Sequence, residues 1–318
     1  MTKTTQSSVA AERSSGEPVA RHHSSWYRIW ASRRLYLLIL PGFGGALLFQ
    51  YYPFLTAFYR SFFSWDGRNA YWVGLNNFEF FISDPRLMIA WVNIGKLLVW
   101  NLFVTMTVPV MVAYLIFRLT NDRHRYIFRV LFVLPIVVPG FVNIILWRWF
   151  FANQGAINIV LRGVGLDAIT RPWLGDPNTA LYALMFMGFP WVSSVTMLIY
   201  LAGFLGIPKE VLDAAVVDGA TGLKRFFKVE LPLIRGQLKL QVVLTFIGTL
   251  QGFETVLIMT RGGPGFSTQV PGLRLYQAAI LDADLGYACA IGTVLFVIIF
   301  GITMINQHFI KGSQALEQ

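Results

Sequence analysis

The chain has 318 residues, of which 55% are hydrophobic and 13% are charged, and its mean hydropathy is +0.57. Soluble domains carry about 25% charged residues. The composition therefore excludes an ordinary water-soluble globule and indicates a chain solvated by lipid. The net charge of +10 could indicate a nucleic-acid partner. We expect none, because the basic residues stand between apolar stretches rather than along one stripe.

Six apolar stretches are long enough to cross a bilayer as helices, which takes about 20 residues each. We expect an all-α membrane protein with six transmembrane helices, because a helix satisfies its backbone polar groups within its own segment. The first stretch begins late and has no small-residue cleavage pattern, which favours an uncleaved span over a signal peptide. The predicted spans are Leu35–Tyr59, Met88–Phe117, Tyr126–Phe151, Thr179–Leu205, Leu233–Met259 and Leu285–Phe309.

The connections between the spans differ in charge. Sixteen Lys and Arg residues fall in one set of connections and seven in the other, which predicts both termini in the cytoplasm. We expect a disordered cytoplasmic tail over residues 1–30, a transmembrane domain over 31–310 and a cytoplasmic tail over 311–318. Pro135 and Pro139 predict a kink in the third span, because proline removes a backbone donor.

A patterned cytoplasmic loop over residues 207–232 joins the fourth and fifth spans. Pro208 suits the first turn of a helix. Gly219 is predicted to end that helix, and Thr221 to cap a second one that runs through Val229, before Pro232 starts the next span. One face of the first helix is predicted to carry Val211, Ala214, Ala215 and Asp218. Such a pair either docks in a cleft of another protein or rests on anionic lipid.

The loop contains a motif of fixed spacing: Asp213-Ala214-Ala215, three residues, Gly219, nine residues, then Val229-Glu230-Leu231-Pro232. This resembles the EAA coupling motif of ABC importer permeases. Asp213 stands where the family usually has Glu, and Val229 where it often has Ile. The resemblance implies that Asp213, Ala214, Ala215, Gly219, Val229, Leu231 and Pro232 contact an ATPase subunit.

Other stretches are similar to carbohydrate permeases of the maltose-transporter MalF type. They include Tyr51-Tyr52-Pro53, Trp65-Asp66-Gly67, Asn77-Phe78, Asp84-Pro85, Gly262-Gly263-Pro264 and Leu285-Gly286-Tyr287. The similarity implies the ABC importer type I permease fold in its six-span form. It also implies a sugar importer of the bacterial cytoplasmic (inner) membrane. The implied partners are a second permease, two ATP-binding cassette subunits and an extracytoplasmic substrate-binding protein.

The sequence carries no motif for catalysis. G-x-x-x-x-G-K-[ST] is absent, so we expect ATP and Mg to bind the partner ATPases and no cofactor to bind this chain. H-E-x-x-H and G-x-S-x-G are also absent. With four His and one Cys, we expect no metal site. The chain is predicted to be a transport subunit rather than an enzyme.

Polar residues within the spans are the candidates for a substrate path, because a charge at the bilayer centre costs about 2.5–3.5 kcal/mol. Lys96 and Glu254 either neutralise one another or face partner side chains or the path. In the maltose permease the segment before the Gly-Gly-Pro turn lines the sugar site. The resemblance therefore implies a path along Gln251, Phe253 and Glu254. Asn93, Asn101 and Asn143 are weaker candidates, because amides often form hydrogen bonds between membrane helices.

Three other functions compete with this interpretation. An ABC permease for a non-sugar solute shares the coupling motif but lacks the Trp65-Asp66-Gly67 and Gly262-Gly263-Pro264 patterns. A secondary transporter usually shows internal repeats with broken helices in both halves, and the sequence shows no convincing repeat. A membrane-bound enzyme needs a cluster of His, Asp or Glu at the interface, which the sequence lacks.

Overall fold

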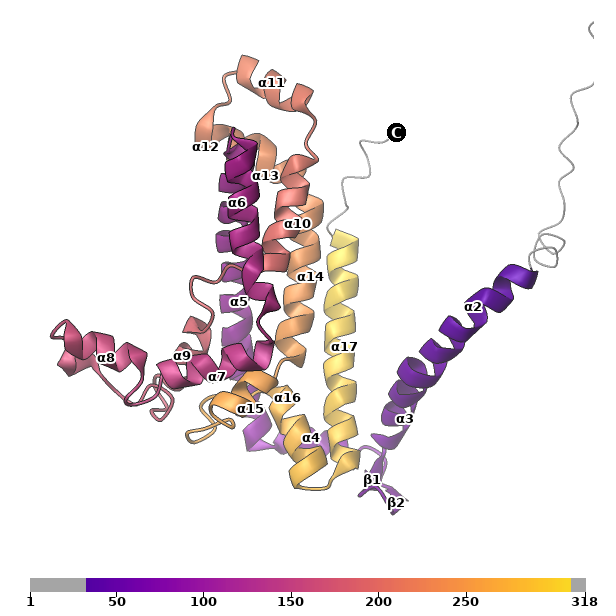
Figure 1. Cartoon of the computed structure of the whole chain (residues 1–318). Coiled ribbons are helices and arrows are strands. Elements are labelled where there is room, and N and C mark those ends of the chain that lie inside the picture. The colour runs from indigo at the N-terminus through magenta and orange to yellow at the C-terminus, as the bar shows by residue number, and fades with distance from the viewer. Residues whose placement is uncertain (1–32, 310–318) are drawn as a thin grey trace, which may run out of the picture. The chain divides into compact units, whose positions relative to one another are not determined.

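The computed structural model describes residues 33–309, which are mainly helical (Figure 1). The chain divides into two compact units, Met1–Thr56 and Ala57–Gln318. The predicted tails 1–30 and 311–318 lie outside the described residues. The predicted first span is confirmed as a continuous helix formed by α2 (Arg33–Ala46), the π-helical turn η1 (Leu47–Tyr51) and α3 (Tyr52–Arg60).

The second unit holds every other described element after α3. In chain order these are β1 (Phe63–Trp65), β2 (Ala70–Trp72), α4 (Asn76–Ser83), α5 (Pro85–Arg118), α6 (Asp122–Val133), η2 (Leu134–Val137), α7 (Gly140–Phe150), α8 (Ala156–Gly163), η3 (Asp167–Ile169), α9 (Ala180–Phe186), α10 (Ser194–Leu205), α11 (Lys209–Val217), α12 (Gly222–Arg225), η4 (Phe226–Glu230), α13 (Leu231–Leu233), α14 (Arg235–Gln251), α15 (Glu254–Met259), α16 (Pro271–Tyr276), η5 (Gln277–Leu281) and α17 (Leu285–Phe309).

Helix α5 is the element around which this unit is built. Its 34 residues make it about 51 Å long, well beyond the ~30 Å hydrocarbon core. It packs against α10 and α14 along its length and against α4 and α16 near its start. Helix α17 has 25 residues and packs against α14, α16 and α4. These two helices confirm the predicted second and sixth spans.

Within the described residues, three helices are long and apolar enough to cross a membrane on their own: Tyr36–Arg60, Pro85–Arg118 and Leu285–Asn306. Three bent helix pairs pass the same test together, so the number of candidate spans is three to six. Two of the bent pairs include the helices of the loop between α10 and α14. The other predicted spans are therefore interrupted rather than straight.

The third predicted span breaks where its prolines lie. The segment Asp122–Val137 and the helix Gly140–Phe150 meet at 89°. Pro135 lies in the 3-10 turn η2, and Pro139 is the N-cap residue of α7. Neither proline can donate a backbone hydrogen bond, so the α-helical ladder ends at this point. The predicted kink is confirmed.

The fourth predicted span was expected to be one helix, and that expectation was wrong. Helix α9 ends at Phe186 and α10 begins only at Ser194. The stretch between them contains Gly188, with φ of 84°, and Pro190. A left-handed glycine followed by a residue without an N–H cannot continue a helix, which explains the interruption.

The fifth predicted span is also interrupted, and it starts later than expected. A bend of 70° separates Gly222–Leu233 from Arg235–Gln251, so the span begins at Arg235 rather than at Pro232. Helix α14 then ends at Gln251, and α15 starts at Glu254. Gly252 adopts an extended conformation, with φ −68° and ψ 123°. We call residues 252–253 the span-five break.

Three apolar clusters form the core of the second unit. One joins α5 and α10 to the loop that follows α10, and it includes Met197, Tyr200, Phe204, Phe226 and Ile234. A second lies around the span-five break and joins α5, α7, α9 and α15. A third joins the start of α5 to η5 and α17. The clusters divide the unit into a loop end, which carries α11 and α12, and a hairpin end, which carries β1 and β2 (Figure 1).

At the hairpin end, β1 and β2 form an antiparallel pair with Trp65 opposite Ala70. Asp66 makes the turn by accepting backbone N–H groups from Asn69 at 2.6 Å and Arg68 at 2.8 Å. These hydrogen bonds hold the pKa of Asp66 below its ordinary value. A Cβ on Gly286 would stand 2.0 Å from the carbonyl oxygen of Phe63. Only glycine lets α17 approach the hairpin so closely.

A buried ion pair joins the start of α5 to the last turn of α16, and Tyr287 ties the start of α17 to it. Nε of Arg274 lies 2.7 Å from Oδ2 of Asp84, and the hydroxyl of Tyr287 donates to the same oxygen at 2.9 Å. Burial acts to raise the pKa of Asp84, but the bonds from Arg274 and Tyr287 outweigh it and hold the pKa below its ordinary value. Arg274 also bonds Asp282 at 2.8 Å. The cluster joins residues 190 positions apart.

We expect Asp84→Ala to destabilise the protein much more than Asp282→Ala. The first change leaves the buried Arg274 charge without its main partner, a loss of about 3–5 kcal/mol. The Asp282 side chain is 45% exposed, so its ion pair contributes about 0–1 kcal/mol. Thermal unfolding of the purified protein in detergent measures both. Equal shifts in unfolding temperature would contradict the central role of Asp84.

Candidate functional site

The loop helices α11, α12 and α13 form the first candidate site. Helix α11 begins after Pro208, as predicted, and its C-cap residue is Asp218. Gly219 has φ of 71°, and the next N–H, that of Ala220, returns to the carbonyl of Ala215 at 2.8 Å. This is the helix end that glycine favours. Gly219 therefore ends α11 as the sequence predicted.

The second loop helix differs from the prediction in two ways. Thr221 occupies the N-cap position but makes no side-chain capping bond. The helix does not stop at Val229, because α12, the π-helical turn η4 and α13 follow one another to Leu233. Pro232 lies in α13, near the C-terminal end of this helical run.

The predicted common face of α11 is split in the structure. Ala215 is buried at 7% exposure, whereas Val211 is exposed at 38%, and Ala214 and Asp218 are also exposed. The inner face consists of Ala215 and the half-buried Leu212, which packs on the cluster around Phe204. The four residues do share one side of the helix, but the buried side is centred between Ala215 and Leu212, so the rest of the predicted face is turned outward.

The outer surface of the loop helices is apolar and charged, with the exposed lysines Lys209, Lys224 and Lys228 and the exposed acids Glu210, Asp213 and Asp218. Val217 is 87% exposed, Leu223 73% and Phe227 60%. Asp213 and Ala214 are exposed beside them, whereas Val229, Leu231 and Pro232 are half-buried against the body of the protein. Large apolar side chains on a helix pair indicate an interaction surface.

A buried carboxylate fixes the loop helices to the end of α5. Glu230 is fully buried, and its Oε1 lies 2.8 Å from Nε of Arg225. Nη1 of Arg118, in the last turn of α5, lies 4.0 Å from the same oxygen. The ring of Phe226 packs against that of Tyr114 of α5, with 4.5 Å between centroids and 50° between the ring planes. The sequence analysis did not identify Glu230 as a structural residue. It could have been singled out because it is an isolated acid in a stretch of basic and apolar residues.

The span-five break is the second candidate site. Gln251 and Glu254 are exposed on either side of it. Phe253 is half-buried and stacks on Tyr276 with 5.6 Å between ring centroids. Two cavities meet at Phe253: one of about 260 Å³ beside Asn101, and one of about 250 Å³ that Gln251 also lines. The break therefore brings an amide, a ring and a carboxylate to open space.

The other path candidates lie on α5 and α7. Lys96 is exposed, and no ion pair within 4.0 Å joins it to Glu254. Asn93 is buried, and its amide donates to the carbonyls of Gln269 at 3.0 Å and Phe266 at 3.3 Å. Asn101 donates to the hydroxyl of Thr249 at 3.0 Å. Asn143 is exposed on α7.

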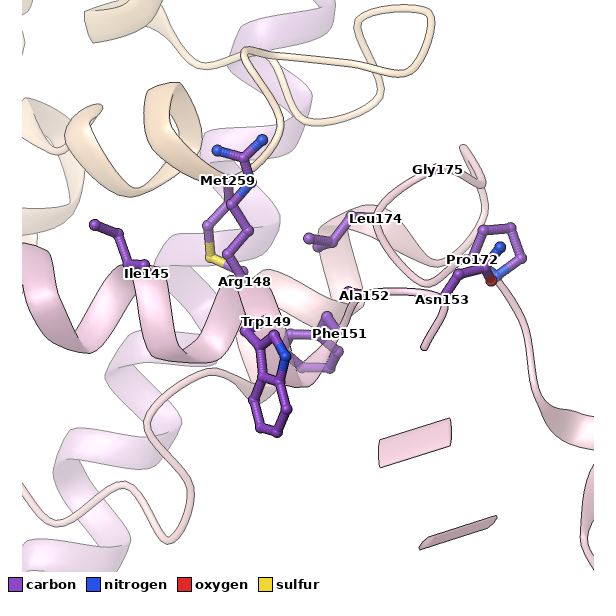
Figure 2. A pocket seen from close by; sticks show the side chains of 10 residues that line it. All are labelled: Ile145, Arg148, Trp149, Phe151, Ala152, Asn153, Pro172, Leu174, Gly175 and Met259. Carbon is purple, nitrogen blue, oxygen red and sulfur yellow. The ribbon is translucent and has the colours of Figure 1, made fainter. Parts of the chain in front are cut away.

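A larger cavity of about 590 Å³ opens where α7 meets the end of α15 (Figure 2). Figure 2 shows Arg148 and Trp149 of α7 and Met259 of α15 among its lining side chains. Arg148 also lines a cavity of about 560 Å³ with Arg261 and Tyr276. Among the described residues, no group of three His, Cys, Asp or Glu could hold a metal ion.

These features define a helical membrane protein with interrupted spans and a structured loop at one end. Residues 105–312 match the family described as the binding-protein-dependent transport system inner membrane component. The chain belongs to that family, which makes it a transport subunit rather than an enzyme. The predicted resemblance to ABC importer permeases is confirmed.

Relatives and a solved structure agree with this assignment. The chain is 35% identical over 279 residues to the probable ABC transporter permease protein YesP of Bacillus subtilis (strain 168), covering 85% of this chain and 88% of that one. It is 30% identical over 275 residues to the multiple sugar-binding transport system permease protein MsmF of Streptococcus mutans, covering 85% and 92%. The fold is similar to a bacterial ABC transporter involved in the import of the acidic polysaccharide alginate: the TM-score is 0.77 at 22% identity, over 90% of this chain and 99% of that chain.

We expect Glu230→Met to loosen the loop helices. The change leaves Arg225, whose side chain is 13% exposed, without its carboxylate, and unpairing a buried charge costs about 3–5 kcal/mol. Tryptic cleavage at Lys224 and Lys228 should become at least about tenfold faster. Glu210→Met is the matched control, because Glu210 is exposed on α11. Equal cleavage of the two variants would show that Glu230 does not hold the loop.

Proposed function

We propose that the chain is a membrane-spanning permease subunit of an ATP-driven, binding-protein-dependent importer. With a second permease it forms the translocation path for a sugar, an oligosaccharide or a sugar derivative. The family assignment supports the transport role. The substrate class is supported by the multiple-sugar relative and the alginate importer. The exposed apolar side chains Val217, Leu223 and Phe227 on the loop helices are the structural observation that carries the proposal.

In this proposal the chain has six spans, the third, fourth and fifth of them interrupted, and both termini lie in the cytoplasm. The excess of Lys and Arg in the connections at the loop end supports this orientation. The bacterial cytoplasmic membrane is the location that the family's description as an inner membrane component favours. The loop helices then stand in the cytoplasm and the β-hairpin outside.

The loop helices are proposed to dock on one of two ATP-binding cassette subunits, which bind ATP and Mg. Asp213 and Ala214 offer exposed contacts on α11, and Gly219 sets the angle between α11 and α12. Ala215, Val229, Leu231 and Pro232 face the body of the protein, so they shape the docking surface from beneath. The competing role, a helix pair that rests on lipid, leaves the exposed acids without partners.

The proposed substrate path passes the span-five break. Backbone without helical bonds at membrane depth is tolerated where it is buried in protein or lines a water-filled cavity. Gln251, Phe253 and Glu254 stand at such a place and offer an amide, a ring and a carboxylate to sugar hydroxyls. Lys96 is an exposed cation on the neighbouring α5. Asn93 is proposed to position the path, because its amide holds the loop after α15.

Helix α14 connects the two candidate sites. Its 17 residues span about 26 Å between the bend at Ile234 and the span-five break. ATP binding is proposed to close the ATPases and move the loop helices, which turns α14 and opens the path towards a docked binding protein. Hydrolysis reverses the change. Coupling requires that the ATPases bind the two permease states with different free energies.

Gly219→Val tests the coupling role. Valine at a φ of 71° is strained, so the contour of the docking surface changes. We expect the ATPase to co-purify less and ATP hydrolysis to lose most of its stimulation by the liganded binding protein. The control is Gly165→Val, where φ is 77° and space is equally open, at the opposite end of the unit. Equal effects of both variants on hydrolysis would contradict coupling through the loop.

Glu254→Ala tests the path. Loss of a hydrogen bond between a charged group and substrate costs about 1.5–3 kcal/mol. We therefore expect sugar-stimulated ATP hydrolysis in liposomes to need about ten times more substrate, or to fall to the basal rate. The sugar is the one that the purified binding protein retains in a ligand screen. Glu79→Ala, on the exposed surface of α4, is the control. Unchanged stimulation in Glu254→Ala would remove this residue from the path.

A further inference from the structure

Two arginines without acidic partners line one cavity at the hairpin end. The cavity of about 560 Å³ lies between α7, α15 and η5, and Arg148 and Arg261 are its charged lining residues. No Asp or Glu lines it or the adjoining cavity in Figure 2. Within the described residues, neither arginine takes part in an ion pair. The cavity is therefore a concentrated positive site.

The backbone of Arg261 adopts a specific and unusual conformation. Its N–H returns to the carbonyl of Val256 at 2.8 Å and so ends α15, with φ at 54°. A non-glycine residue seldom adopts such a φ, and two glycines follow directly. Glycine would fit this turn without strain. An arginine that keeps this strained conformation indicates a functional role for its side chain in the cavity.

The cavity lies on the outward continuation of the proposed path. Leu257 and Ile258 line it, and they follow Glu254 by three and four residues on α15, so all three share a face. Glu254 lies about one helical turn deeper. Tyr276 and Gln277 add a phenol and an amide to the lining. The volume falls within the range of 300–1,000 Å³ typical of small-molecule sites.

We propose that Arg148 and Arg261 bind the carboxylate of an acidic sugar, so that the importer carries uronic-acid saccharides. This inference rests on the transport function proposed above and names its substrate class. A guanidinium binds a carboxylate through two parallel N–H donors, which lysine cannot match. The acid group is held at the outer cavity by the two arginines. The neutral hydroxyls of the saccharide then reach Gln251 and Glu254. The Glu254 carboxylate is in this way kept apart from the negative charge of the substrate.

The test measures binding to the complete permease–ATPase complex in phosphatidylcholine nanodiscs. Digalacturonate is titrated calorimetrically against its uncharged dimethyl ester. We expect the acid to bind at least about tenfold more tightly than the ester. Arg148→Gln and Arg261→Gln together should remove this preference and leave the affinity for the ester unchanged. Arg68→Gln is the control, because Arg68 is exposed in the hairpin turn and lines neither cavity.

Three results would overturn the proposal: equal affinity for acid and ester, an acid affinity that the double variant leaves unchanged, or no binding of the acid below about 10 mM. If the double variant instead weakens only the docking of the binding protein, the arginines serve that protein. Co-purification of the ATPase is recorded in the same preparations. An intact complex that does not prefer the acid refutes the substrate class alone, whereas a chain that recruits no ATPase refutes the transport function.

Discussion

Every backbone polar group at membrane depth needs a partner within the protein, and the architecture of this chain depends on how that demand is met at its helix breaks. Side chains of neighbouring helices supply the missing donors. The indole N–H of Trp100 on α5 donates to the carbonyl of Met185, beside the break in the fourth span, at 2.8 Å, and Trp191 donates to the same oxygen at 3.1 Å. The hydroxyl of Ser194 donates to the carbonyl of Phe132, next to the proline break, at 2.7 Å.

Through these bonds α5 holds the interrupted spans in place as well as connecting the two ends of the unit. Trp100, Asn93 and Asn101 all lie on α5, and each bonds a segment next to an interruption or a turn. The breaks in the fourth and fifth spans are therefore tied to one uninterrupted helix, whose start is fixed by the buried pair of Asp84 and Arg274. In the proposed mechanism, α5 is the fixed scaffold against which the path moves.

The sequence predicted what local signals encode and missed what depends on distant contacts. Apolar length identified α5 and α17, and Pro135 with Pro139 identified the break in the third span. The span-five break has only Gly252 as a local signal, and a single glycine is tolerated within helices. Glu230 escaped notice because one of its partners, Arg118, lies more than a hundred residues earlier in the chain. Asn93 was predicted as a path candidate, and the sequence could not reveal that its amide donates to carbonyls more than 170 residues away.

The strength of the contacts along α14 determines whether the proposed motion is possible. Thr196 bonds Gln241 at 3.3 Å and Asn101 bonds Thr249 at 3.0 Å, which link α14 to α10 and α5. Hydrogen bonds between membrane helices contribute about 0.6 kcal/mol each on average, so a turn of α14 exchanges them at small cost. The ion pair of Glu230 with Arg225 lies within the loop helices, is buried and resists separation. In the proposed mechanism the loop helices therefore move as one piece, and α14 carries their motion to the span-five break.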